Sequence, residues 1–184
     1  MRNIKVWMFH YVRPEGLDPL PHLNVFNIEK FKKFLNEKQN DGFFISPKDF
    51  FDCINKNTNF PKNSHLLTFD DGLSCHYKYV FPELIERDIK ALFFIPSGPF
   101  LLNNLLTVHK THCIYGNLGY SRFRELFMLK SGINHDLFDE SYVDIKAKEA
   151  YPYDVDQIAN FKYAINYILK PSFTNPILNN IIET

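Results

Sequence analysis

The stretch that decides the fold is Leu66-Leu67-Thr68-Phe69-Asp70-Asp71-Gly72, in which an apolar run ends in two adjacent carboxylates and a glycine turn. In a parallel sheet, ligands bind outside the carboxyl ends of the strands. Side chains that leave a strand there are held by a rigid base and face the substrate. The pattern therefore indicates a functional role for Asp70 and Asp71. Asp and Gly also dominate ordinary turns, so a plain turn is the alternative interpretation.

The segments around this stretch alternate between strand and helix patterns. Short apolar or aromatic runs at 6–12, 42–45, 66–69 and 90–95 are typical of buried strands. The intervening segments 27–38, 46–54 and 74–87 carry apolar residues at helical spacing. Asn27 is a candidate N-cap, Pro47 suits a helix start, and Pro82 should bend or divide the third helix. This order predicts parallel strands joined by right-handed crossovers.

The last part of the chain has a different pattern. Beyond about Val108, apolar residues recur only at helical spacing, and the sequence predicts no strand after Ile95. We therefore expect an α/β part over residues 1–107 and a helical extension over 108–184, packed together as one domain. A chain of 184 residues is long enough for one substantial core.

Composition excludes several classes of function. Lys plus Arg and Asp plus Glu both number 21, so no basic surface for nucleic acid is expected. Three widely spaced cysteines argue against a disulfide framework and against a structural zinc knuckle. The amino terminus has too short an apolar run for a secretory signal, and no segment reaches the length of a membrane span. A cytoplasmic protein is the simplest expectation.

Two further segments carry a family resemblance. Thr68-Phe69-Asp70-Asp71-Gly72 precedes an aromatic-rich helix and the apolar run Ala91-Leu92-Phe93-Phe94-Ile95-Pro96. Near the start of the chain stands Met8-Phe9-His10-Tyr11-Val12-Arg13-Pro14. Together these segments resemble the polysaccharide deacetylase family (carbohydrate esterase family 4, the NodB homology domain). The resemblance covers roughly residues 4 to 115. It implies a distorted (β/α) barrel of about seven strands, of which the sequence predicts about four, hence a partial barrel followed by the helical segment.

The resemblance also implies a function. Members of the family are metal-dependent hydrolases that remove N-acetyl groups from a polysaccharide or a sugar precursor. By position in the motif, Asp70 is then the general base and Asp71 a ligand of a divalent metal, expected to be zinc. A metal of this kind acidifies water and polarises the carbonyl. The expected partner is a carbohydrate, and the absence of a recognisable export signal favours a precursor inside the cell.

The sequence departs from the family pattern at the other metal ligands, because it contains no His-Ser/Thr-x-x-His motif. The nearest candidate is His109-Lys110-Thr111-His112, whose spacing would place both imidazoles on one helical face toward a zinc ion. The alternative interpretation is that His109 and His112 simply cap or line a helix. A third possibility is that the family's histidines lie beyond Thr184, in a missing C-terminal half. A homo-oligomer is a further possibility.

Other interpretations stay open at this stage. The chain could be a truncated, non-catalytic deacetylase-like module with a sugar-binding or structural role. Two adjacent aspartates also suit magnesium in phosphoryl transfer, although no Gly-rich phosphate loop accompanies them. His10 could touch the site from the first strand, but a hydrogen-bonded core histidine is the favoured interpretation. His65, just before the motif, is predicted to be an exposed loop residue.

Overall fold

The computed structural model describes residues 3–15, 20–133 and 145–184. The chain divides into two compact units. The first comprises Met1–Leu17 and Asn24–Ser97, and the second comprises Asp18–Leu23 and Gly98–Thr184. Of the described helices, none is long and apolar enough to cross a membrane.

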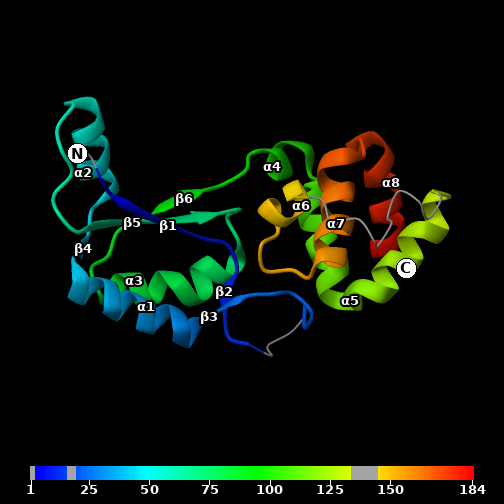
Figure 1. The fold of residues 1–184 in the computed structure, drawn as a ribbon, viewed down its shortest axis with the longest axis horizontal. Helices are drawn as coiled ribbons and strands as arrows, with labels where there is room; N and C mark the ends of the chain where they lie inside the picture. The colour runs from blue at the N-terminus through cyan, green and yellow to red at the C-terminus, as the bar shows by residue number, and fades with distance from the viewer. Residues whose placement is uncertain (1–2, 16–19, 134–144) are drawn as a thin grey trace. The chain divides into compact units, whose positions relative to one another are not determined.

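A parallel sheet forms the centre of the first unit (Figure 1). Its middle strand is β5 (Ser64–Asp70), the strand that carries the motif. β1 (Lys5–Phe9) pairs along one edge of β5, from Lys5 with His65 to Phe9 with Phe69. On the other edge, β4 (Phe43–Phe44) pairs at the start of β5, and β6 (Leu92–Phe94) pairs at its end. All of these pairings are parallel, as predicted from the alternation of strands and helices.

Two helices cover one face of this sheet. Figure 1 shows α1 (Ile28–Asp41) and α3 (Phe81–Glu86) along the same side of the strands, whereas α2 (Pro47–Asn55) follows β4. The buried core between them is rich in aromatic residues because β1 and β5 both send phenylalanines to this face. Its buried members are Val12, Ile28, Phe31, Leu35, Leu67, Phe69, Val80, Leu84 and Ile89. A short second sheet, β2 (Val12–Arg13) with β3 (Phe26–Asn27), completes the unit.

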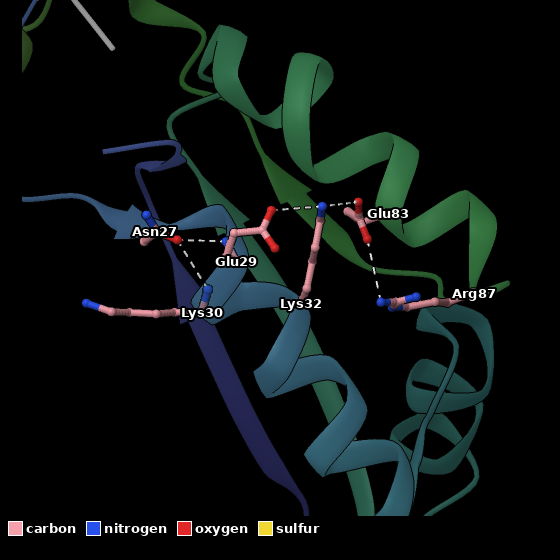
Figure 2. Close-up of polar contacts among 6 residues, drawn as sticks. All are labelled: Asn27, Glu29, Lys30, Lys32, Glu83 and Arg87. Atoms are coloured by element: carbon pink, nitrogen blue, oxygen red, sulfur yellow. Dashed lines mark hydrogen bonds and ion pairs between the residues drawn. The ribbon is translucent and has the colours of Figure 1, made fainter. Parts of the chain in front are cut away.

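The start of α1 is fixed by its cap and tied to α3 by charge (Figure 2). Asn27 accepts hydrogen bonds from the backbone N–H groups of Glu29 and Lys30, which satisfies two amides that the helix cannot pair internally. Lys32 then bridges Glu29 on its own helix and Glu83 on α3, at 3.0 and 3.3 Å. The two hydrogen bonds to Asn27 confirm the N-cap expected from the sequence.

The predicted helix over 74–87 is divided, as its proline indicated. A π-helical turn, η1 (His76–Val80), precedes α3, and the N–H of Phe81 bonds back to the carbonyl of His76. Pro82, with no N–H of its own, stands in the first turn of α3, where a proline is tolerated. The two elements meet without a break, because the backbone stays helical through Val80 and Phe81, and only the hydrogen-bond pattern changes there.

The second unit is helical. Its described elements are α4 (Gly98–Leu102), α5 (Thr107–Ser131), α6 (Ile145–Ala150), α7 (Asp156–Tyr163), the π-helical turn η3 (Ala164–Ile168) and α8 (Pro171–Ile182). α5 is kinked at Gly119, whose φ is 73°. In the core of the second unit, Phe123 and Phe127 pack against Phe161. The ring centroids of Phe123 and Phe161 lie at a distance of 5.1 Å.

Several details differ from the sequence-based expectations. The described strands of the main sheet form an open arrangement, so barrel closure stays an expectation from the resemblance. The predicted strand over 6–12 is two strands, because the chain leaves β5 after Phe9 and Val12 joins β3 instead. The first compact unit ends at Ser97 and α4 belongs to the second, while the predicted division after residue 107 stays a prediction. Packing of both parts as one domain stays a prediction.

Gly42 occupies a position where only a hydrogen atom fits. A Cβ built on Gly42 would stand 1.9 Å from the carbonyl oxygen of Asn63, and both residues flank paired strands. Gly42→Ala is expected to lower the free energy of unfolding by about 1–3 kcal/mol, since the backbone itself must shift. Urea unfolding followed by circular dichroism, which reports on the helices of both units, measures it. Gly98→Ala, whose Cβ would meet only ordinary contacts, is the control; equal effects of the two changes would contradict the account.

Candidate active site at the carboxyl edge of the sheet

Asp70 is the last residue of β5, and β1 brings His10 to it. Because Phe9 pairs with Phe69 in parallel register, the next residue of each strand leaves the sheet at the same level. The Nε2 atom of His10 lies 3.9 Å from Oδ2 of Asp70, and the two side chains are 42% and 28% exposed. Neither group is buried, so both are open to a ligand. The separation is too long for a direct hydrogen bond and suits a bridging water or substrate atom.

The position of His10 corrects its favoured interpretation as a core histidine. Its imidazole is 42% exposed and faces Asp70 rather than the core. His65 also differs from its prediction as a loop residue, because it lies within β5 and is 1% exposed. The indole N–H of Trp7 donates to its Nδ1, 3.2 Å away, and burial lowers the pKa of the imidazole. β5 begins two residues earlier than predicted, because its first two residues, Ser64 and His65, are polar and yet buried.

The turn after β5 holds Asp71 in an uncommon backbone conformation. Asp71 and Gly72 have φ values of 76° and 60°, both in the left-handed region. Asp is one of the few residues with a Cβ that is enriched there, although the conformation still costs energy. A Cβ at Gly72 would also meet Ile95 at 3.1 Å. The chain therefore turns sharply at Asp71, so Asp70 ends the extended strand whereas Asp71 already belongs to the turn.

His76 contacts both β5 and the residue after β1 at the same edge of the sheet. Its Nε2 lies 2.6 Å from the carbonyl oxygen of His10, and its ring packs against Phe69 and Phe93 at centroid distances of 5.3 and 6.0 Å. The side chain is 3% exposed, and this burial lowers the pKa of its imidazole. Sequence reasoning did not single out His76, because its role depends on a contact 66 residues away.

The two histidines proposed as metal ligands both lie on α5, three residues apart as predicted. His109 is buried and His112 is half-buried. Between them, Lys110 is 1% exposed; its ammonium donates to the amide oxygen of Asn175 at 3.4 Å, and burial lowers its pKa. His109 and His112 belong to the second unit and Asp71 to the first, so this ligand set stays a prediction.

A metal site needs several ligands that converge on one point. In residues 3–15, 20–133 and 145–184, no group of three or more His, Cys, Asp or Glu side chains is arranged to hold a metal ion. Asp70 and His10 form a pair, not a three-ligand set.

Comparison with protein-family models gives no match, and comparison with curated proteins gives none either. Among solved structures, the chain is similar to a de-N-acetylase from Aggregatibacter actinomycetemcomitans, with a TM-score of 0.41, 23% identity, and coverage of 49% of this chain and 36% of that one. It is also similar to the Streptococcus pyogenes deacetylase PplD in complex with acetate (TM-score 0.46, 17% identity, 97% and 80% coverage). A third is IcaB from Ammonifex degensii (TM-score 0.44, 20% identity, 100% and 80% coverage).

The mixed α/β arrangement with parallel strands is consistent with the deacetylase-like fold that the motif resemblance predicts. The chain spans about a third of the length of the Aggregatibacter protein, at 36%. Two of the three structures are deacetylases by their descriptions.

Proposed function

We propose that this chain is a hydrolase that removes an N-acetyl group from a polysaccharide or a sugar precursor. The single observation that supports this most is the pairing of Asp70 with His10 at the carboxyl ends of two adjacent parallel strands, 3.9 Å apart and open to a ligand. A carboxylate facing an imidazole across a gap the size of one bridging atom is suited to moving protons to and from a reacting group.

The chemistry assigned to the pair is amide hydrolysis. The oxygen of a water molecule attacks the acetyl carbonyl carbon while Asp70 accepts a proton from that water. The C–N bond then breaks, and the sugar nitrogen takes a proton from the protonated imidazole of His10. Acetic acid and the free amine are released, and a proton passing from Asp70 to His10 restores the starting state. General acid–base catalysis of this kind contributes about 10²- to 10⁴-fold to a rate.

The experiment that tests the function is release of acetate from N-acetylglucosamine oligomers and from a nucleotide-linked N-acetyl sugar, with and without added zinc. The proposal expects acetate and a free amine in equal amounts. A folded chain that releases none under any of these conditions would contradict the catalytic proposal and would instead favour the non-catalytic, sugar-binding module. Equal release from a heat-unfolded sample would also contradict it.

Zinc binding by Asp71, His109 and His112 is a separate proposal that comes from the family resemblance, and the chemistry assigned to Asp70 and His10 does not depend on it. We expect His112→Ala and Asp71→Asn each to weaken zinc binding by about 10- to 100-fold, because removal of a ligand costs at least as much as removal of a group that supports one. Isothermal titration with zinc measures the affinity. His22→Ala, at an exposed histidine, is the control. Zinc affinity that is the same in all four proteins would remove these ligands from the proposal.

A further inference from the structure

We propose that His76 is a positioning residue that holds the His10 imidazole opposite the Asp70 carboxylate; this rests on the proposed function. β1 ends at Phe9, so the peptide of His10 lies beyond the paired part of the strand. The hydrogen bond from Nε2 of His76 to the carbonyl oxygen of His10, at 2.6 Å, fixes that peptide from η1. A residue that fixes the backbone of His10 also fixes the direction from which its side chain approaches Asp70.

The contact determines the tautomer of His76. A carbonyl oxygen only accepts, so Nε2 must carry the proton and donate. Burial lowers the pKa of His76, and the hydrogen bond to the His10 carbonyl and the charges of Asp71 and Asp70 oppose this effect only in part. His76 is therefore a neutral donor with Nδ1 as an unprotonated nitrogen. Among the residues that the structure describes, this buried Nδ1 atom has no hydrogen-bond partner.

The unpartnered nitrogen gives this arrangement a cost. A buried polar atom without a partner destabilises a fold by about 1–3 kcal/mol, and an apolar side chain of similar shape would avoid that cost. The ring is also wedged against Phe69 and Phe93, the residues that immediately precede Asp70 and its strand neighbour Phe94. A leucine or phenylalanine at position 76 would fill the same space between these rings. Only a side chain with a hydrogen-bond donor can bond to the carbonyl oxygen of His10.

The chain offers a matched control at the other end of β5. His65 is also buried, also has one ring nitrogen in a hydrogen bond, with Trp7, and also leaves its second ring nitrogen without a described partner. It lies five residues before Asp70 and touches neither member of the pair. His65→Leu therefore reports what loss of a buried histidine costs when the Asp70–His10 pair is not involved.

The experiment compares His76→Leu, His76→Gln and His65→Leu with the wild-type chain. Gln keeps an N–H donor at the end of a side chain of similar reach, whereas Leu removes it. We expect His76→Leu to lower kcat for acetate release by about 10- to 100-fold with KM nearly unchanged, because a displaced catalytic group loses the reacting geometry. His76→Gln should recover most of this loss. His65→Leu should lower Tm by a similar amount to His76→Leu but leave kcat within about twofold.

Crystal structures of the two His76 variants give a readout that does not depend on activity. His76→Leu should move the imidazole of His10 away from Asp70, and His76→Gln should keep the wild-type separation. An unmoved His10 in His76→Leu would overturn the inference, as would a His76→Gln variant whose kcat is as low as that of His76→Leu. A wild-type chain without deacetylase activity would instead defeat the proposed function, while the two crystal structures would still decide whether His76 positions His10.

Discussion

Asp70→Asn is expected to lower kcat for acetate release by about 10²- to 10⁴-fold, the contribution of a general base. The amide has nearly the same shape as the carboxylate but does not accept a proton from the attacking water. Because the side chain is partly exposed and lies at a strand end, the free energy of unfolding should change by less than about 1 kcal/mol. Steady-state kinetics with an N-acetylglucosamine oligomer measures the first effect, and urea unfolding measures the second.

Asp88→Asn is the control for this change. Asp88 is exposed, follows α3, and has a left-handed backbone that Asn also tolerates. It should keep wild-type kinetics. If Asp70→Asn retained the activity of Asp88→Asn, Asp70 would not be the base, and its place at the carboxyl edge of the sheet would have a purely structural explanation.

Phe69→Ala is expected to lower the free energy of unfolding by about 3–5 kcal/mol, which is a large part of the stability of a domain. Phe69 is fully buried, and its ring lies 5.0 Å from that of Phe93 and 5.6 Å from that of Phe9. Its removal leaves a cavity at the junction of the three strands. The single tryptophan, Trp7, lies in β1 of the same unit, so its fluorescence during urea unfolding reports on this unit.

Phe43→Ala provides the comparison for Phe69→Ala. Phe43 also lies in a strand that pairs with β5, but it is 44% exposed. Its removal should cost less than about 1 kcal/mol, since less apolar surface returns to water. If the two substitutions destabilised the unit equally, the core would not be built around the phenylalanine of the motif.

The sequence predicts the local features of the first unit well. The N-cap at Asn27, the helix start at Pro47 and the division at Pro82 follow from side-chain hydrogen bonding and from the missing N–H of proline. These effects act within a few residues along the chain, so the local sequence is enough to predict them. The strands of the main sheet follow for the same reason, because buried parallel strands read as short apolar runs.

Features that depend on long-range register are the ones that the sequence misses. His10 meets Asp70 because Phe9 pairs with Phe69, and a shift of one residue would turn His10 to the other face. The signal that was available is the shared pattern of a histidine or an aspartate directly after a strand phenylalanine. His76 leaves no such signal, since its hydrogen bond joins residues 66 positions apart. The zinc ligands expected from the sequence, Asp71, His109 and His112, stay a prediction.

A double-mutant cycle on Asp70 and His10 tests the central claim most directly. It compares kcat/KM for acetate release in the wild-type chain, Asp70→Asn, His10→Ala and the double variant. Because the proton that Asp70 accepts must pass to His10 in each turnover, the account predicts strong non-additivity, with the double variant about as slow as Asp70→Asn alone. Losses that simply multiply, or a His10→Ala variant with wild-type kcat/KM, would contradict the claim that the two residues form one catalytic pair.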